Sequence, residues 1–242
     1  MNIAMWSGPR NLSTAMMYSF AARGDCDVWD EPFYGAYLAA TDIDHPMRAE
    51  ILASGETDPQ IVRDRCQGDG PKGKPHFYQK HMTQHMISGF PLDWMSDCVN
   101  VFLIRHPARV IASYAVKRDH PTQEDLGFQR QWELFETASI LSGVTPTILD
   151  SADLRDDPAD MLDQLCQAIG LPYSDAMLRW PAGGNPDDGA WAPHWYGSVH
   201  KSTGFAGPEN ALPELEDHYN GLLEEALPIY ERLRDAALKP KK

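Results

Sequence analysis

The sequence predicts an α/β fold with three layers (α/β/α), in which helices cover both faces of a mostly parallel central sheet. Short apolar strand segments alternate with helical segments along most of the chain, and this alternation is typical of parallel sheets. The 242 residues contain no repeat, no low-complexity linker and no abrupt change of composition. We therefore expect residues 1–242 to form a single domain that is large enough to bury its own core.

The first half of the chain supplies three predicted strands. IAMWS is followed by a turn and by the helical segment NLSTAMMYSFAAR, which Gly24 ends as a C-terminal cap. The second strand, CDVWD, leads into DEPF, where Pro32 forces Glu31 out of the helical region. The amphipathic segments PMRAEILAS and DPQIVRDRCQ and a polar turn then precede the third strand, HFYQK. The chain thus opens with strand, turn and helix.

The second half repeats this order. NVFLIR is the clearest buried strand, and PARVIASYAVKRD is predicted as the helix after it, with Pro107 in its first turn. TQEDLGFQRQWELFETASILSG is expected to be one long helix, opened by a capping pattern from Thr122 to Asp125. The strand TPTILD and the helix DPADMLDQLCQAIG follow. A long loop comes next, and a final helix is expected from about residue 212 to residue 238.

Composition argues against several classes of partner. The formal net charge is −14 and no basic stripe offsets it, so we expect no nucleic-acid partner. No apolar run approaches the roughly 20 residues needed to cross a bilayer, so we expect no membrane span. The amino terminus has no basic region and no secretory apolar stretch. We therefore expect residue 1 to open the fold and the protein to be cytoplasmic.

The spacing of cysteines and histidines argues against a metal site. The four cysteines are scattered without a CxxC pair, which favours free buried thiols in a reducing compartment. The tight histidine pair in HMTQH lacks the glutamate that the HExxH motif requires. We therefore expect no metal. Because the net charge is −14, an anionic ligand must be met by a small, concentrated positive site. No heptad or exposed apolar strip indicates an oligomeric state.

The turn SGPRNLST, between the first strand and its helix, has the features of an anion site. A turn at the carboxyl end of a parallel strand presents free N–H groups and the positive end of the helix dipole. Arg10 adds a permanent charge, and Ser13 and Thr14 add hydroxyl donors. The nucleotide P-loop GxxxxGK[ST] is matched poorly, because Ser13 and Thr14 replace its second Gly and its Lys. If this segment is considered by itself, the alternative interpretation is a helix N-terminus with a cap and no bound ligand.

A second strand, turn and helix carries a similar pair of residues. Arg105 ends the strand NVFLIR, and Ser113 lies on the next helix, about 12 Å along its axis. We expect the long Arg105 side chain to lean back toward Ser113, so that the two form a second anion pocket beside the first. Taken singly, Arg105 is more often a surface charge and Ser113 a packing residue. Two anion pockets on neighbouring strands indicate a ligand with phosphates at both ends of a nucleoside.

These two segments resemble the cofactor motifs of the sulfotransferases. SGPRNLST is similar to their 5′-phosphosulfate loop, IRHPARVIASY to their 3′-phosphate motif, and ILDSADLRDDPADMLDQLCQAIGLP to a later strand and helix of the family. The resemblance covers most of the chain and implies the P-loop NTPase-like sulfotransferase fold. It also implies cofactor contacts from Ser7, Gly8, Pro9, Arg10, Asn11, Leu12, Ser13, Thr14, Arg105 and Ser113.

The resemblance implies an enzyme that moves a sulfuryl group from 3′-phosphoadenosine 5′-phosphosulfate (PAPS), without a metal, to a hydroxyl or amine of a small acceptor. The chain is similar in particular to small bacterial sulfotransferase-like proteins, some of whose relatives carry aminotransferase-like labels. Its sequence has no glycine-rich phosphate cup paired with an evident Schiff-base lysine. Pyridoxal chemistry is therefore not expected.

Catalytic roles for four residues follow from the same resemblance. Arg10 would neutralise charge on the leaving phosphate, acting through charge alone because arginine does not give up its proton. Glu31, after the second strand, and His81, in FYQKHM, compete for the role of general base, and Glu31 is the first choice. Lys80 would hold the sulfuryl oxygens. Taken singly, Glu31 is consistent with a turn cap, His81 with a core histidine and Lys80 with a surface charge.

The late loop WAPHWYGSVHKSTGF offers further contacts. VHKSTGF is similar to the family loop that closes over the 3′-phosphate, which implies Lys201 and Ser202 as ligands, although the usual Arg-Lys-Gly order is absent. Trp191, Trp195 and Tyr196 either cover the adenine or the acceptor as a lid or pin the loop to the core.

Two other functions stay open. A nucleotide or small-molecule kinase of the same architecture would bind ATP with magnesium, and the missing GK[ST] counts against it. A non-catalytic nucleotide-binding relative would keep the fold without turnover. The sequence does not specify the acceptor, because the segments expected to form its pocket carry no motif for a steroid, sugar, lipid or amino acid.

Overall fold

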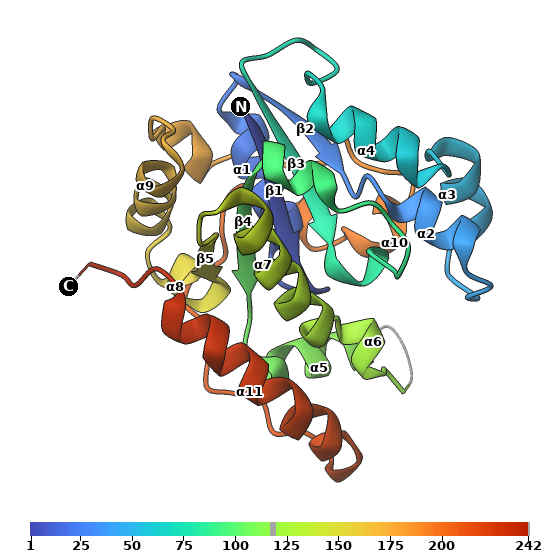
Figure 1. Cartoon of the computed structure of the whole chain (residues 1–242). Helices are drawn as coiled ribbons and strands as arrows, with labels where there is room; N and C mark the ends of the chain where they lie inside the picture. Colours follow the sequence, from blue (N-terminus) through green and yellow to red (C-terminus); the bar gives the residue numbers. More distant parts are fainter. Residues whose placement is uncertain (117–119, 242) are drawn as a thin grey trace.

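The structure is a computed structural model that describes residues 1–116 and 120–241 (Figure 1). Its centre is a five-stranded sheet of order β2-β3-β1-β4-β5, in which every pairing is parallel. The strands are β1 (Asn2–Ser7), β2 (Cys26–Asp30), β3 (His76–Met82), β4 (Val99–Ile104) and β5 (Thr147–Asp150). All five lie where the sequence predicts strands, and the predicted α/β fold with a parallel sheet is confirmed.

Helices cover both faces of the sheet and give the molecule three layers (Figure 1). The helices are α1 (Ser13–Ala22), α2 (Tyr34–Ala40), α3 (Arg48–Ser54), α4 (Pro59–Gln67), α5 (Pro107–Ala115), α6 (Gln123–Leu126), α7 (Phe128–Ser142), α8 (Ser151–Asp156), α9 (Pro158–Ile169), α10 (Ala192–Trp195) and α11 (Asn220–Ala236). Successive side chains of a strand point to opposite faces. In β1, Trp6 therefore packs with α4, α5, α7 and α11, while Met5 packs with α1 and α9.

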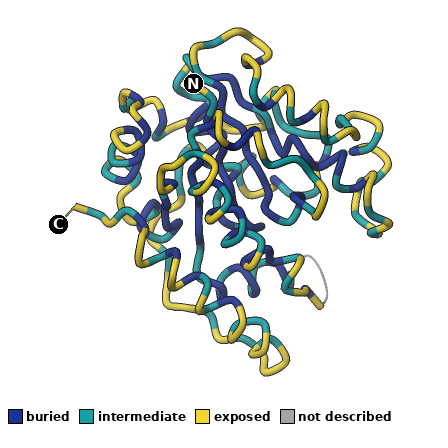
Figure 2. The backbone as a smooth tube through the Cα atoms, in the orientation of Figure 1, coloured by how far each residue is buried: buried dark blue, intermediate teal, exposed yellow. Residues whose placement is uncertain are grey.

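Burial follows this layering. Figure 2 shows the strands buried along most of their length, with exposed positions on the outer sides of the helices. All four cysteines are buried and free, as the sequence predicts. Within the described ranges, no helix combines the length and the apolar character needed to cross a membrane. The same ranges contain no group of three or more His, Cys, Asp or Glu side chains placed to hold a metal ion.

Two helix predictions are wrong in their extent. The segment expected to be one helix divides into α6 and α7, because Gly127 has a φ of 72° and ends α6. The predicted capping box is present, since Thr122 and Asp125 exchange hydrogen bonds between side chain and backbone. The final helix begins at Asn220 rather than near residue 212, because residues 212–216 have no regular structure and residues 217–219 form a short 3₁₀ helix. Residues 117–119, predicted as helix, lie outside the described residues.

Short 3₁₀ helices complete the element order: η1 (Thr83–His85), η2 (Asp93–Asp97), η3 (Asp175–Leu178), η4 (Val199–Lys201) and η5 (Asp217–Tyr219).

Candidate functional site

Two strand-to-helix turns meet at the carboxyl edge of the sheet. The chain passes to one side of β1 to form β2 and β3, and to the other side to form β4 and β5. β1 and β4 therefore stand where the order of strands reverses, and in open α/β sheets a crevice lies outside the carboxyl ends at that point. The turn after β1 and the turn after β4 both open there.

The turn after β1 has a strained backbone. Arg10 and Leu12 have left-handed conformations, with φ of 63° and 66°, and this region costs a non-glycine residue about 1–2 kcal/mol. Leu12 is the N-cap of α1, and none of the described side chains caps the first turn of that helix. The N–H groups and the positive dipole end of α1, together with the hydroxyls of Ser13 and Thr14, are thus available to an anion.

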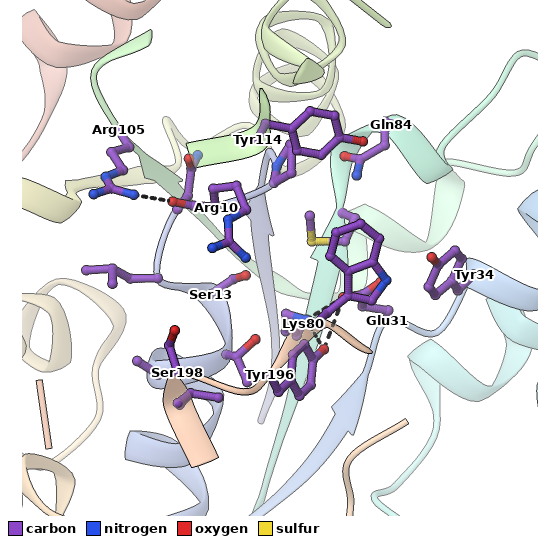
Figure 3. Close-up of a pocket in the computed structure, with 18 of the residues that line it drawn as sticks. Arg10, Ser13, Glu31, Tyr34, Lys80, Gln84, Arg105, Tyr114, Tyr196 and Ser198 are labelled. Atoms are coloured by element: carbon purple, nitrogen blue, oxygen red, sulfur yellow. Dashed lines mark hydrogen bonds and ion pairs between the residues drawn. The ribbon is translucent and has the colours of Figure 1, made fainter. Parts of the chain in front are cut away.

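Hydrogen bonds hold the two turns against each other (Figure 3). Arg105 Nη1 donates to the carbonyl oxygen of Arg10 over 2.8 Å, and Arg10 Nε donates to Ser113 Oγ on α5 over 2.9 Å. The sequence predicts that Arg105 reaches Ser113, but Arg10 is the arginine that contacts it, because Arg105 is engaged with the backbone of the first turn. Asn11 Nδ2 adds a hydrogen bond of 3.3 Å to a backbone carbonyl oxygen of β4. The two predicted anion pockets are therefore parts of one network.

A cleft with a volume of about 290 Å³ opens beside this network (Figure 3). The turn after β1 and Arg105 line one side of the cleft, and Glu31 and Lys80 lie across from them. Burial, and next the charge of Arg105, lower the pKa of Arg10. Ten residues assigned cofactor or catalytic roles from the sequence line the cleft: Pro9, Arg10, Asn11, Leu12, Ser13, Thr14, Glu31, Lys80, Arg105 and Ser202.

Lys80 stands at the centre of a buried cluster of polar side chains. Its Nζ donates to Asp30 Oδ1 over 2.9 Å, to Glu31 Oε1 over 2.5 Å and to the Tyr196 hydroxyl over 2.6 Å. Burial lowers the pKa of Lys80, but Asp30 and Glu31 outweigh it and raise the pKa above its usual value. Burial raises the pKa of Asp30 despite the Lys80 charge. The lysine is therefore a fixed cation that holds the Glu31 carboxylate.

Glu31 lies where this cluster meets the cleft. Its φ of 43° is left-handed, and hydrogen bonds hold the residue on both sides. Its N–H donates to the Lys80 carbonyl oxygen over 2.9 Å, and its own carbonyl oxygen accepts from the Tyr34 N–H over 3.0 Å. Strained backbone that is fixed in this way tends to mark functional positions. Glu31 Oε2 lies 3.9 Å from His85 Nδ1.

His81, the rival for the role of base, lies in the core and does not line the cleft. It follows Lys80 in β3, so its side chain points to the other face of the sheet. Its ring stacks on Trp6 with the ring centroids 4.6 Å apart, and the residue is 1% exposed. Burial, and next His85, lower the pKa of His81 to about 3. The structure thus separates the two adjacent residues that the sequence placed in one site.

An aromatic wall lines the cleft near Glu31. The His85 ring stacks on Tyr34 and on Tyr37, with centroid distances of 4.2 and 4.9 Å. Burial lowers the pKa of His85 well below its usual value, so the ring is neutral. The aromatic lining residues are Tyr34, Tyr37, His45, His85, Tyr114, Trp195 and Tyr196. Of these rings the sequence predicts only Trp195 and Tyr196, because the others come from segments far apart in the chain and stand in no motif.

The late loop covers this end of the cleft and is also pinned to the core. Trp191 Nε1 donates to the Tyr196 hydroxyl over 2.9 Å, and Tyr196 is buried against Lys80. Trp195, by contrast, lines the cleft. Ser202 lines it as well, whereas Lys201 is exposed and is not among the lining residues. Trp191 and Tyr196 therefore pin the loop to the core, and a covering role for Trp195 stays a prediction.

Two residues proposed from the sequence lie next to the turn after β1 on the side away from the cleft. Ser7 is fully buried at the end of β1, where its hydroxyl lies 3.8 Å from Met82 Sδ. Gly8 packs against the backbone of α6, so that a Cβ at this position would lie 2.7 Å from the Leu126 carbonyl oxygen. Neither residue lines the cleft. Their role is to allow the turn to sit close to its neighbours.

Gly8→Ala is expected to destabilise the fold by about 1–3 kcal/mol, because the new methyl group meets a backbone oxygen that cannot swing away. The shift in the midpoint of urea unfolding measures this effect. Gly221→Ala in α11 is the matched control, since nothing lies within 4 Å of a Cβ there, and alanine in a helix should stabilise by about 0.5–1 kcal/mol. An unchanged midpoint for Gly8→Ala contradicts the close approach.

Comparisons of the sequence with known proteins give one family and two curated relatives. A sequence model of the sulfotransferase domain matches residues 1–237. Two Arabidopsis thaliana proteins, named branched-chain-amino-acid aminotransferase-like protein 2 and protein 1, are 39% and 40% identical to this chain over 239 and 238 residues. These alignments cover 96% of this chain but 41% of each plant protein, so the chain spans about two fifths of their length.

A solved structure shares the fold. The crystal structure of a sulfotransferase from Alicyclobacillus acidocaldarius matches with a TM-score of 0.56, covering 99% of this chain and 96% of that chain at 10% identity. At this identity the likeness concerns the fold alone. The family match, in contrast, runs over nearly the whole chain and includes both turns that form the cleft. The chain therefore belongs to the sulfotransferase domain family.

Proposed function

We propose that this domain transfers a sulfuryl group from PAPS to a hydroxyl or amine of a small acceptor. The observation that carries the proposal is the arrangement of one cleft, with Arg10 and Arg105 on one side and the Glu31 carboxylate on the other. A cationic wall suits an anionic donor, and a carboxylate across from it can take the acceptor proton.

The residues of the two turns fit the charged ends of the donor. The N–H groups of α1 with Ser13 and Thr14 would hold the 5′-phosphosulfate, and Arg10 beside them would neutralise the leaving phosphate. Arg105 would meet the 3′-phosphate. Ser113 supports this site by fixing the Arg10 guanidinium through their 2.9 Å hydrogen bond. When bound, PAPS supplies an activated sulfuryl group with a phosphate as its leaving group.

We assign the general base to Glu31, because His81 is buried in the core on the other face of the sheet. The acceptor oxygen or nitrogen forms a bond to sulfur, its proton passes to the Glu31 carboxylate, and the bond from sulfur to the bridging oxygen breaks with its electron pair going to that oxygen. Lys80 orients the carboxylate through its hydrogen bond to Glu31. Because Asp30 and Glu31 already pair its charge, we do not assign it to the sulfuryl oxygens, the role expected from the sequence.

The acceptor end of the cleft suits an uncharged or cationic molecule. The Lys80 charge is already paired with two carboxylates, and the lining residues there are mostly aromatic. Glu31 and Asp125, which also line the cleft, are acidic. An anionic acceptor would lose its hydration in this end of the cleft without gaining an ion pair with a cation. Aromatic faces, in contrast, attract apolar groups and ammonium groups.

The aminotransferase-like names of the plant relatives are not carried over to this chain. This chain spans 41% of the length of those proteins. The sulfotransferase domain model, in contrast, matches residues 1–237 of this chain.

The nucleotide product analogue 3′-phosphoadenosine 5′-phosphate (PAP) tests the donor site. At about 100 times its dissociation constant, PAP should raise the unfolding midpoint by roughly 5–10 °C without magnesium. Arg105→Ala should remove most of this shift, because the variant loses the cation proposed for the 3′-phosphate. Thermal unfolding with PAP, ADP or Mg-ATP makes the comparison. A shift with Mg-ATP alone would favour a kinase, and no shift with any of the three would contradict a nucleotide site.

A further inference from the structure

Three arginine side chains converge on one carboxylate beside the cleft. Glu209 Oε1 accepts from Arg105 Nε over 3.0 Å and from Arg155 Nη1 over 2.9 Å, and Glu209 Oε2 lies 2.7 Å from Arg109 Nε. The Glu209 side chain is 3% exposed, and the arginine side chains are 15–18% exposed. The arginines come from the end of β4, from α5 and from α8, so the fold brings them together from separate segments.

Glu209 belongs to an otherwise exposed loop, residues 204–212, which we call the strap. Residues 206–208 and 210–212 of the strap are exposed, so Glu209 is the one side chain among these positions that is largely buried. Polar contacts also hold the strap backbone, because Arg155 donates to the Gly207 carbonyl oxygen over 2.8 Å and Arg109 donates to the Asn210 carbonyl oxygen. The arginines thus hold residues 207–210 of the strap. Its first residues are held separately, because Phe205 packs edge-on against Trp180 with the ring centroids 5.2 Å apart and Gly204 forms a bridge with Arg179.

The charges of this cluster do not balance. Arg105, Arg109 and Arg155 carry three positive charges, and Glu209 supplies one negative charge. A phosphate monoester carries about −1.5 to −2 charges near pH 7 and offers three strong acceptor oxygens. It would therefore satisfy the three guanidinium groups better than a carboxylate, which carries one charge and two oxygens.

Arg105 joins the cluster to the cleft. It is a lining residue of the cleft, together with Gly204 and Ala206 of the strap, and it also contacts both Glu209 and the Arg10 carbonyl oxygen. A ligand that reaches Arg105 from the cleft therefore arrives at the guanidinium group that Glu209 engages.

We propose that Arg105, Arg109 and Arg155 form a phosphate site and that Glu209 occupies this site until the 3′-phosphate of the nucleotide displaces it. This inference rests on the proposed function, since it takes the nucleotide to be 3′-phosphorylated. Arg109 and Arg155 then become phosphate ligands that lie outside the residues of the two cofactor motifs. Glu209 acts as an internal competitor, which keeps the arginines paired in the absence of nucleotide and helps to expel the bisphosphate product.

If Glu209 competes with the 3′-phosphate, removing the charge of Glu209 should tighten the binding of PAP. If the strap is closed in nine tenths of the molecules, the apparent dissociation constant of PAP is about tenfold higher than that of the open form. Glu209→Gln keeps the shape of the side chain and removes its charge, so it should tighten PAP binding by about tenfold. The affinity for 5′-AMP, which has no 3′-phosphate, should not change. Isothermal titration calorimetry measures both ligands.

The unfolding midpoint gives a second readout of the same exchange. Glu209→Gln should lower the midpoint of the free protein, because the arginines lose their partner, and should leave the midpoint of the PAP-saturated protein equal to that of the wild type. Glu214→Gln is the matched control, since Glu214 is an exposed glutamate a few residues further along the chain. It removes the same charge and should change neither quantity.

Arg155→Gln provides an independent variant, because Arg155 is not among the residues that line the cleft. It should weaken PAP binding by about tenfold, as expected for the loss of one charged hydrogen bond, with 5′-AMP unaffected. Equal effects on PAP and 5′-AMP would overturn the phosphate site.

The two proposals fail in different ways. If wild type binds PAP but Glu209→Gln weakens that binding and lowers the midpoint with and without PAP, Glu209 has only a structural role. The inference is then overturned, while the sulfotransferase proposal stands. If wild type binds neither PAP nor 5′-AMP, the proposed function fails and the inference fails with it.

Discussion

Glu31→Gln is expected to lower kcat by about 10²–10⁴-fold, the range typical for loss of a general base. The glutamine side chain has the same shape and its oxygen can still accept from Lys80, whose second carboxylate partner, Asp30, stays in place. It cannot, however, take a proton from the acceptor. Steady-state rates with PAPS and an accepted acceptor measure kcat, and calorimetry should show PAP binding close to that of the wild type.

His81→Phe separates the two assignments of the base. The His81 ring is stacked in the core, and its Nε2 lies 3.2 Å from Gln79 Oε1 in a buried hydrogen bond. A phenyl ring keeps the stacking but leaves that amide oxygen unpaired, so the substitution should lower stability by about 1–3 kcal/mol without changing a residue that lines the cleft. We expect kcat to stay within about threefold of the wild type. A folded His81→Phe protein that loses as much activity as Glu31→Gln would move the base to His81. Unchanged turnover in both variants would exclude both residues.

The order of the elements was predictable because each one has a local cause. β1 and β4 are short, mostly apolar runs next to a turn. Gly24, Gly143 and Gly170 have the left-handed conformation expected where they follow α1, α7 and α9. The break between α6 and α7 was missed because Gly127 lies inside an amphipathic pattern that continues on both sides of it. A single glycine within such a pattern is compatible with a helix as well as with a break.

The two turns that line the cleft were predictable from the sequence, but the prediction that both Lys80 and His81 belong to the site was wrong for His81. Both residues lie in β3, and adjacent side chains of a strand point to opposite faces. The predicted strand HFYQK ends at Lys80, whereas β3 continues for two more residues, so the alternation extends to His81. With the longer strand, only one of the two side chains can face the cleft.

Other parts of the site depend on contacts that no local pattern carries. Tyr196 is 166 positions from Asp30 and meets it in the Lys80 cluster, and Glu209 is 104 positions from Arg105. Neither Tyr196 nor Glu209 stands in a motif whose chemistry requires a partner of this kind. Only the fold brings them together, so the strap and its arginines could not be found from the sequence.

Arg10→Ala is also expected to lower kcat strongly. The decrease should be about 10²–10³-fold, as when one charge-stabilising donor is removed from an active site. The backbone of the turn should survive, because Arg105 donates to the carbonyl oxygen of residue 10, which alanine also has. The loss should therefore report the guanidinium group and not a collapsed loop. PAP should still stabilise the variant, though less than the wild type.

Arg10→Lys distinguishes charge from geometry at the same position. Lysine restores the positive charge but not the Nε–H that Arg10 donates to Ser113, so it isolates the contribution of that hydrogen bond. If charge dominates, Arg10→Lys should recover kcat to within about tenfold of the wild type, and Ser113→Ala should resemble it. If Arg10→Lys is as slow as Arg10→Ala, the fixed orientation of the guanidinium is the larger effect, and Ser113 is then a positioning residue for the reaction. Equal and undiminished kcat in Arg10→Ala and Arg10→Lys would remove Arg10 from the chemistry altogether.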